Sequence, residues 1–587
     1  MKSFFKNVLS TIVGMILSVI VIILLFIGII SLNLSSINNK NEVDVKENSV
    51  LNINLSETSV VERTSENPFN GLNFSGDIAK TISLKQVLDN IEKAKTDEKI
   101  KAIYINTSFV NAGISKIEEI RSKLLEFKQT GKPIIAYSEV YSQMAYYLSS
   151  VANKIYLNPE GIIEIKGLSA SIMFYKGLLE KLDVDVQIIR HGKFKGAVEP
   201  FILDKMSKEN RDQMQLFLNS VANNIMDSIA NQRGLTLSEI QRHADNLSLE
   251  NAKSCLNLNY VDALLYQDQL EDTLKTLAGA EKLSFVTLSK YTHAKGDKKE
   301  ISRNKIAIIY ATGTINSGKG DEKSIGSETT AKAIKKARED KNVKAIVFRI
   351  NSGGGSALAS DVIWRETVLA KAKKPLVVSM GDYAASGGYY IACAADSIIA
   401  NPTTLTGSIG VFGMIPNLQN LYKNKLGITL DTVNTNNHAD MGVNRPLTKF
   451  EKNKIQKSVE DIYTTFITHV GQGRKMSTTA VDEIGQGRVW AGYDAKEIGL
   501  IDVYGGIEKA IEIAASLAKI EDYRIISLPK KKDPFTELAL KLGDNSSFAD
   551  ILFTKLGLRT ELTEPIETLL KSDKIQARVP FIMKLKQ

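Results

Sequence analysis

The sequence predicts an α/β protein that consists of two copies of one domain behind an N-terminal transmembrane helix. Three observations indicate this class: an apolar stretch at residues 8–32, an alternation of short apolar runs with helical patterns, and similar segments about 240–246 residues apart. The chain has 587 residues, which is too long for a single hydrophobic core.

The N-terminal segment has the composition of a signal anchor. Lys2 and Lys6 are followed by no charged residue until Lys40. The apolar span 8–32 suits a bilayer, which needs about 20 residues, whereas a cleavable signal has an apolar region of about 7–15. We expect an uncleaved helix with its lysines in the cytoplasm and residues 33–587 across the membrane. In a bacterium this topology places a single-pass protein in the inner (cytoplasmic) membrane with a periplasmic body; a cleaved long signal is the alternative.

The composition excludes several classes of site. The net charge is +9, but the lysines are spread along the chain without a basic stripe between aromatics, so no nucleic-acid binding is expected. Only Cys255 and Cys393 are present, which excludes a disulfide framework; Cys393 is expected as a buried apolar side chain. The five histidines show no ligand spacing, and neither a metal nor a cofactor is expected.

The first repeat begins with VLNINLSE, which has the composition of a buried strand. SLKQVLDNIEKAKT then reads as a helix, because Leu84, Leu88 and Ile91 share one face and Ser83 can cap the N-terminus. The second repeat begins with KIAIIYATGTI, and its runs KAIVFRI and PLVVSM flank the helical pattern ALASDVIWRETVLAKAKK. This alternation predicts parallel strands with right-handed crossovers.

The repeat is visible in three pairs of segments: 99–107 with 342–352, 131–161 with 373–404, and 178–200 with 421–446. These pairs and the apolar span divide the chain into six predicted parts. They are the cytoplasmic N-terminus and transmembrane helix 1–32, a linker 33–48, the first repeat 49–288, a linker 289–304, the second repeat 305–528 and a tail 529–587.

The two copies differ where chemistry is expected. The second copy has AASGGYY where the first has YSQMAYY, and alignment on Tyr389 and Tyr146 puts Ser386 opposite Gln143. A serine between a strand and two glycines is typical of a presented nucleophile, although a plain strand-to-helix turn has the same pattern. Only the second copy therefore offers this candidate.

The difference is reversed further along the chain. The first copy has HGKFKGAVEP and the second NHADMGVNRP, and alignment on the prolines puts Lys195 opposite Met441. Each copy thus has one half of a nucleophile–base pair, which predicts one composite site where the copies pack together. Spacing alone does not distinguish Lys195 from Lys193.

The chemistry of such a pair is established in general terms. A serine hydroxyl needs a positioned base, and lysine serves only when burial lowers its pKa from about 10.4. Serine–lysine pairs are a known variant of the nucleophile–base arrangement. The oxyanion of the acyl-transfer intermediate must be held by backbone N–H groups that form an oxyanion hole. We expect Gly354 of RINSGGGSA and Gly387 to line this oxyanion hole.

Four motifs resemble a known family: FKGAVEPF (194–201), RINSGGGS (349–356), MGDYAASGGYYIA (380–392) and NPTTLTGSIGVFG (401–413). Over residues 1 to about 528 the chain resembles the long, duplicated form of signal peptide peptidase A, or protease IV. The resemblance implies two crotonase/Clp-protease-like domains and a serine endopeptidase with Ser386 as nucleophile. It also implies Lys195, rather than Lys193, as general base.

The resemblance has further implications. Ser408 would orient the lysine, and the first copy has Leu168 at that position. The family implies a bowl-shaped homotetramer that degrades remnant signal peptides on the extracytoplasmic side, with residues 8–32 in the lipid bilayer. One departure stands out, because the family usually has proline where this chain has Gly353.

The sequence is also compatible with three other functions. A crotonase-type acyl-CoA enzyme would use the glycine loops without Ser386. A Ser–His–Asp hydrolase would use His438 and Asp440, which lie in the loop opposite the lysine motif. A membrane-anchored scaffold with a decayed site would need none of these residues.

Overall fold

The structure is a computed structural model that describes residues 10–11, 14–15, 17–18, 21, 43–64, 80–294, 302–321, 324–530 and 575–579. The predicted transmembrane helix 8–32 lies outside these residues apart from seven isolated positions. Among the helices of the described part, none has the length and apolar character of a membrane span.

The first half of the chain forms a six-stranded sheet in which every pairing is parallel. Its order is β8-β6-β5-β4-β1-β9, and β1 begins at Ser49, where the first repeat is predicted to begin. The strands are β1 (Ser49–Ile53), β4 (Ile100–Ile105), β5 (Ile134–Tyr141), β6 (Lys154–Ile163), β8 (Ala263–Leu264) and β9 (Ser284–Thr287).

The predicted helix after Ser83 is α2 (Leu84–Thr96), and the side chains of Ser83 and Gln86 form a capping box at its start. The helices of this half are α2, α3 (Ile114–Lys128), α4 (Gln143–Ser149), α5 (Lys176–Lys181), α6 (Glu199–Ile202), α7 (Lys208–Arg233), α8 (Leu237–Asp245), α9 (Ala252–Asn257), α10 (Gln267–Ala278) and α11 (Leu288–Tyr291). The predicted linker 289–304 therefore begins inside α11.

The second half forms an eight-stranded sheet, of which six strands have the order β19-β17-β15-β13-β10-β21. The other two extend it from β15, because β16 pairs with β15 and β20 pairs with β16. The pairings are parallel except that of β17 with β19. The strands are β10 (Lys305–Thr312), β13 (Val343–Ser352), β15 (Leu376–Ala385), β16 (Ser397–Ala400), β17 (Leu405–Gly407), β19 (Val489–Ala491), β20 (Val503–Tyr504) and β21 (Arg524–Leu528).

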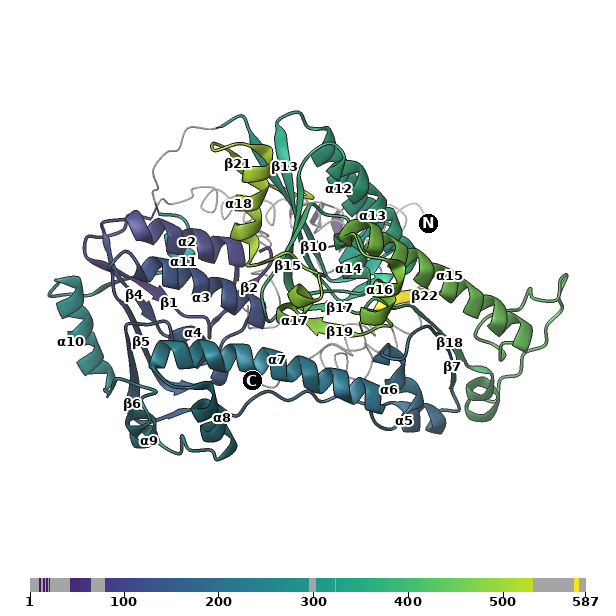
Figure 1. Ribbon diagram of the computed structural model, residues 1–587, viewed down its shortest axis with the longest axis horizontal. Coiled ribbons are helices and arrows are strands. Elements are labelled where there is room, and N and C mark those ends of the chain that lie inside the picture. Colours follow the sequence, from purple (N-terminus) through teal and green to yellow (C-terminus); the bar gives the residue numbers. More distant parts are fainter. Residues whose placement is uncertain are drawn as a thin grey trace.

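The helix predicted between the two apolar runs of this half is confirmed as α13 (Ala357–Lys371), between β13 and β15. The other helices are α12 (Ser327–Glu339), α14 (Gly387–Ala392), α15 (Lys449–Arg474), α16 (Thr478–Ile484), α17 (Gly492–Glu497) and α18 (Ile507–Ala518). In Figure 1, α12 and α13 lie on one side of this sheet and α18 on the other, toward the first half.

A third sheet joins the two halves and the tail. Its order is β12-β11-β14-β22-β18-β7, and it combines one strand of the first half with four of the second and one of the tail. The strands are β7 (Asp185–Arg190), β11 (Thr314–Asn316), β12 (Ser324–Gly326), β14 (Gly354–Ser356), β18 (Phe412–Asn417) and β22 (Ile575–Arg578). A separate parallel pair consists of β2 (Thr58–Val61) and β3 (Lys80–Ser83).

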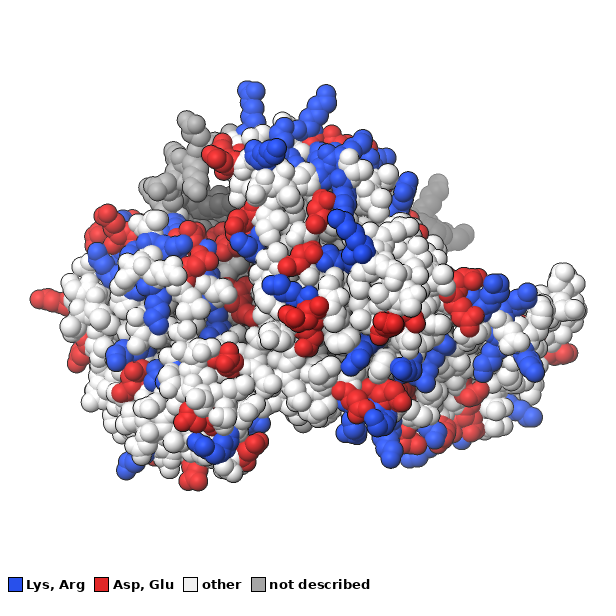
Figure 2. Space-filling model, in the orientation of Figure 1, with Lys and Arg blue, Asp and Glu red and all other residues white. Residues whose placement is uncertain are grey.

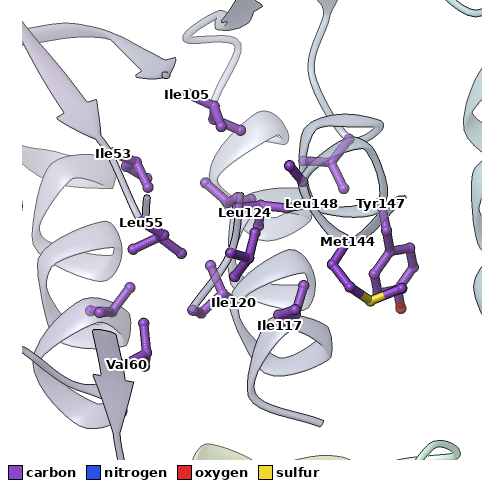
Figure 3. Close-up of a cluster of buried hydrophobic side chains, with 14 of the residues drawn as sticks. Ile53, Leu55, Val60, Ile105, Ile117, Ile120, Leu124, Met144, Tyr147 and Leu148 are labelled. Carbon is purple, nitrogen blue, oxygen red and sulfur yellow. The ribbon is translucent and has the colours of Figure 1, made fainter. Parts of the chain in front are cut away.

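The halves also share a hydrophobic core. Figure 3 shows its part around α3, where Ile117, Ile120 and Leu124 meet side chains of β1, β2, β4 and α4. The same cluster continues to Ile306 of β10 and Ala510 of α18. In Figure 1, α7 runs from beneath the first sheet toward α5 and α6, and it contacts β19.

The face drawn in Figure 2 carries basic and acidic side chains interspersed over both halves. Neither sign of charge gathers into one large patch on this face. Cys255 and Cys393 are both buried free thiols, as expected for Cys393 from its apolar neighbours.

Candidate active site

Ser386 lies at the turn from β15 into α14 with φ 56° and ψ −116°. A positive φ is rare for a residue with a side chain and costs of order 1–3 kcal/mol, so such strain is concentrated at functional sites. The Ser386 N–H donates to Gly407 O at 2.8 Å, and its carbonyl accepts from the Tyr390 N–H at 2.8 Å. These bonds hold the turn, and the side chain is fully buried.

Lys195 reaches this turn because β7 leaves the first half and pairs antiparallel with β18 of the second. Arg190 at the end of β7 lies opposite Phe412, and the lysine follows five residues later. The N–H of Phe194 donates to Gln486 O at 3.0 Å, which fixes the backbone next to Lys195 against the second half. The composite arrangement therefore arises within one chain.

The amine of Lys195 lies 2.7 Å from Ser386 Oγ and 3.1 Å from both Oγ and O of Ser408. All three side chains are fully buried. Burial lowers the pKa of Lys195 well below its usual range. The three residues predicted from the sequence thus meet in one water-excluded cluster.

Ser408 is held by its backbone as firmly as Ser386. Its φ is 50°, its N–H donates to Arg488 O at 2.6 Å, and its hydroxyl donates to Gly487 O at 3.3 Å. That hydroxyl keeps lone pairs with which it can accept from the lysine amine. Ser408 can therefore fix the direction of the lysine lone pair.

Gly354 and Gly387 lie beside one another next to Ser386. A Cβ atom added to Gly387 would lie 3.2 Å from the Cα of Gly354, and one added to Gly354 would lie 2.7 Å from the backbone nitrogen of Gly387. Gly354 also has φ 96°, which favours glycine. The carbonyl oxygen of Ala577 in β22 borders both glycines.

Other candidates lie elsewhere. Lys193 is exposed, with its amine over the ring of Phe194. His438 Nδ1 lies 2.8 Å from Glu451 Oε1, and Asp440 forms an ion pair with Arg445. Among the described residues, Ser386 Oγ has Lys195 and Gly410 O as partners, so neither His438 nor Asp440 is bonded to it.

Two supporting residues were not predicted. Gly487 has φ 87°, and a Cβ atom there would lie 2.7 Å from N, Cα and Cβ of Lys195. Gln213 of α7 donates to Phe194 O at 2.9 Å and accepts from the Val489 N–H at 3.1 Å. The glycines of GQGRVW are a signal that could have indicated Gly487, whereas a single glutamine on a long helix gives none.

Residues that could hold a metal are not gathered at this site. Across the described ranges, no cluster of three or more His, Cys, Asp or Glu side chains is arranged as metal ligands. The site around Ser386, Lys195 and Ser408 consists instead of hydroxyl, amine and backbone groups, which suit nucleophilic and general-base chemistry.

The chain matches known proteins over most of its length. The profile of peptidase family S49 matches residues 126–281 and 369–521. Protease 4 of Haemophilus influenzae is 33% identical over 86% of this chain and 84% of that protein. The chloroplastic serine protease SPPA of Arabidopsis thaliana is 34% identical over 86% of this chain and 75% of that protein.

Among solved structures, ClpP1 from Listeria monocytogenes is 15% identical, with a TM-score of 0.22 over 34% of this chain and 91% of that chain. The extent of the sequence matches, together with the two profile matches, identifies the family. The chain belongs to peptidase family S49 and is a serine peptidase.

Proposed function

We propose that this peptidase is a membrane-anchored endopeptidase that degrades remnant signal peptides on the extracytoplasmic side, with Ser386 as nucleophile and Lys195 as general base. One observation carries the proposal: a buried lysine amine lies 2.7 Å from the hydroxyl of a strained serine. Strongly perturbed titratable groups beside a candidate nucleophile are typical of active sites.

Burial favours a neutral lysine, and the contacts of the amine fit that form. A neutral amine has two N–H donors and one lone pair. The donors suit the carbonyl and hydroxyl oxygens of Ser408, each 3.1 Å away, and the lone pair then accepts the Ser386 O–H. This assignment makes Lys195 the base and gives Ser408 a positioning role.

The reaction then follows from these contacts. Ser386 Oγ attacks the scissile carbonyl carbon while its proton moves to Lys195 Nζ, and the backbone N–H groups of Gly354 and Gly387 stabilise the oxyanion. The C–N bond breaks as Lys195 gives the proton to the leaving amine. Water, deprotonated by Lys195, then cleaves the acyl-serine ester and regenerates Ser386.

The proposal includes a tandem duplication. The first sheet has the order β8-β6-β5-β4-β1-β9, and the second repeats it with β20, β16, β15, β13, β10 and β21 as counterparts. This shared order and the two profile matches support two copies of a crotonase/Clp-protease-like domain. We propose the boundaries 49–288 and 305–528 for them.

We further propose that residues 8–32 anchor the protein in the bacterial inner membrane and that it works as a homotetramer. The apolar composition of 8–32 supports the anchor. An anchor would hold the site close to apolar peptides released into the bilayer. The tetramer rests on the family resemblance.

Hydrolysis of a fluorogenic apolar peptide and of casein by the full chain tests the mechanism. Ser386→Ala and Lys195→Ala are expected to lower kcat by at least about 10²–10⁴-fold, because a nucleophile and its base act as a unit. Lys193→Ala and His438→Ala serve as controls and should keep wild-type activity, since neither side chain contacts Ser386.

An inactive His438→Ala variant together with an active Lys195→Ala variant would show that a Ser–His–Asp set, and not the serine–lysine dyad, carries out catalysis. Circular dichroism of each variant shows whether loss of activity reflects loss of fold. Cysteine accessibility at residues before and after 8–32 in sealed membranes tests the proposed topology.

A further inference from the structure

The helix α3 of the first half begins without a cap of its own. Its N-cap residue is Gly113, which has no side chain to accept the N–H groups of the first turn. Asp382 of β15 takes this role from the second half. Its Oδ1 accepts from the Ser115 N–H at 3.2 Å, and its Oδ2 accepts from the ammonium of Lys116. A carboxylate is favoured at this end of a helix, so the second half completes α3 of the first.

The matching helix of the second copy, α13, caps itself. The two copies align at Tyr146 and Tyr389. The same offset puts Gly113 opposite Ser356, the N-cap residue of α13. The Ser356 hydroxyl accepts from the Ala359 N–H at 3.2 Å. The first copy therefore lacks the local cap at the place where it meets the second half.

Gly113 also permits the approach of Asp382. A Cβ atom at position 113 would lie 2.1 Å from Oδ1 and 2.2 Å from Cγ of that carboxylate. The φ of Gly113 is −69°, so the backbone itself does not require glycine. At the position that matches Asp382 the first copy has Glu139, which is exposed. The glycine and the aspartate thus form a matched pair across the halves.

The start of α3 also holds the loop 401–404. Asn401 Nδ2 donates to the Ser115 hydroxyl at 2.8 Å and to the Ser115 carbonyl at 3.1 Å. Thr403 Oγ1 donates to Glu118 Oε2 at 2.6 Å. Ser115 and Asn401 are buried, so a hydrogen bond lost here is costly.

Both segments held by α3 run directly into the candidate site. We call the contacts of residues 113–118 with Asp382 and the loop 401–404 the α3 contact. β15 ends directly before Ser386, and the loop continues as β17, which ends directly before Ser408. The two strands pair in parallel along this stretch. A shift at the α3 contact therefore moves both serines.

The lysine reaches the site by a separate route. Lys195 belongs to the first half and is delivered by the pairing of β7 with β18. The distance between its amine and the Ser386 hydroxyl therefore depends on how the second half is seated on the first. A displacement of about 1 Å is enough to disturb a catalytic geometry. A composite site of this kind requires a rigid contact between the halves close to the serine.

We propose that Asp382 is a positioning residue of the dyad. Its cap on α3 holds β15 and β17 in place, and so fixes Ser386 and Ser408 relative to Lys195. The inference rests on the proposed dyad and deepens it, because it names a contact that sets the serine–lysine geometry. Asp382 acts through the strand that leads to Ser386 and not on the substrate.

Gly113→Ser separates this contact from the capping of α3. The added hydroxyl can cap the helix as Ser356 caps α13, whereas the added Cβ atom displaces the Asp382 carboxylate. With the full chain and a fluorogenic peptide, kcat is expected to fall about 10–10²-fold with KM nearly unchanged, because the serine–lysine geometry matters in the chemical step. Gly177→Ser is the control and should keep the wild-type kcat, since a Cβ atom at this glycine of α5 meets nothing within 4 Å.

A second pair of variants tests the cap acceptor itself. Both carry Lys116→Met, which removes the ammonium that an amide at position 382 would face, while Glu62 keeps its ion pair with Arg349. In this background Asp382→Asn retains an oxygen for the Ser115 N–H, and Asp382→Ala does not. The variant with Asp382→Asn is expected to have a kcat about tenfold higher than the variant with Asp382→Ala.

The loss of a helix cap as such is controlled by Ser83→Ala. This change removes the N-cap of α2, which packs beside α3 and whose capping bonds are made with Gln86. Its melting temperature should fall while its kcat remains that of the wild type. Circular dichroism of every variant establishes the fold before the kinetic constants are compared.

Four results would overturn the inference. The first two are a folded Gly113→Ser variant with the wild-type kcat, and equal kcat values for the two variants that carry Lys116→Met. The others are a Ser83→Ala or a Gly177→Ser variant that loses as much kcat as Gly113→Ser does.

The dyad variants distinguish this inference from the proposed function. If Ser386→Ala or Lys195→Ala hydrolyses the peptide as the wild type does, the proposed function fails. If both are folded and inactive while the variants at Gly113 and Asp382 keep the wild-type kcat, only the positioning role of Asp382 fails.

Discussion

Lys195 illustrates how burial changes the protonation of an ordinary side chain. In water its amine is protonated at neutral pH, but in this cluster burial lowers its pKa, and its polar contacts are hydroxyl and carbonyl oxygens. A carboxylate partner would hold the proton on the amine instead. The burial of the amine therefore matters as well as the 2.7 Å contact with Ser386.

At the residue scale, the pH dependence of peptide hydrolysis tests whether Lys195 acts as a neutral base with a lowered pKa. Below the lowered pKa, Lys195 is protonated and cannot accept the serine proton; above it, the amine is neutral and active. For a substrate without titratable groups, kcat/KM is expected to rise with pH and to level off well below about pH 10.4, the ordinary pKa of lysine. A rate that falls as pH rises through neutrality would mean that a protonated group is required.

At the scale of elements, the pairing of β7 with β18 delivers the lysine, and a turn of the second half holds it in place. Gly487 sits in this turn with φ 87° and presses against the backbone of Lys195. Glycine is needed there for two reasons, the positive φ and the close approach. Gly499 also has a positive φ, 78°, but no close approach, because a Cβ atom there would meet nothing within 4 Å.

This contrast gives a matched pair of variants. Gly487→Ala is expected to displace Lys195 and to lower kcat by about 10²-fold, because a shift of about 1 Å is enough to disturb a catalytic geometry. Gly499→Ala should show similar backbone strain, about 1–2 kcal/mol, with an unchanged kcat. Steady-state kinetics and thermal unfolding of both variants check this, and equal losses of kcat would refute the positioning role of Gly487.

At the scale of the whole molecule, a buried charge cluster joins the two halves. Arg349 of β13 is fully buried and contacts Glu62 and Glu119 of the first half, each at 2.8 Å, and Lys116 forms ion pairs with Glu62 and Asp382. Burial alone would raise the pKa of Glu62, but Arg349 and Lys116 hold it at about 2. Both carboxylate partners of Arg349 come from the first half, so these ion pairs form only when the halves are packed together.

Removal of the central cation is expected to destabilise the packed halves. Arg349→Met removes the cation that contacts both buried carboxylates, so Glu119 loses its ion pair while Glu62 keeps the one with Lys116. The free energy of unfolding should fall by about 3–5 kcal/mol. Arg365→Met, at an exposed arginine, should change it by less than about 0.5 kcal/mol. Urea unfolding measures both, and a small effect of Arg349→Met would show that the charge cluster does not stabilise the packing.

The sequence determined the elements and the candidate chemistry. Periodicity and capping predicted α2 and α13. The reciprocal differences between the copies indicated Ser386 and a lysine of KFKG, and the family resemblance implied Lys195 rather than Lys193. Local patterns carry this information because hydrophobic periodicity and turn residues act over a few positions. The roles proposed for these residues remain predictions.

Only the tertiary structure shows which of the two lysines contacts Ser386, since it buries Lys195 beside that serine and exposes Lys193. It also decided the support from Gly487 and Gln213, the charge cluster of Arg349, and the position of the tail. These features join residues far apart in the chain, such as Gly355 and Ala577. No local pattern encodes such pairings, because they depend on how sheets and helices close against each other in space.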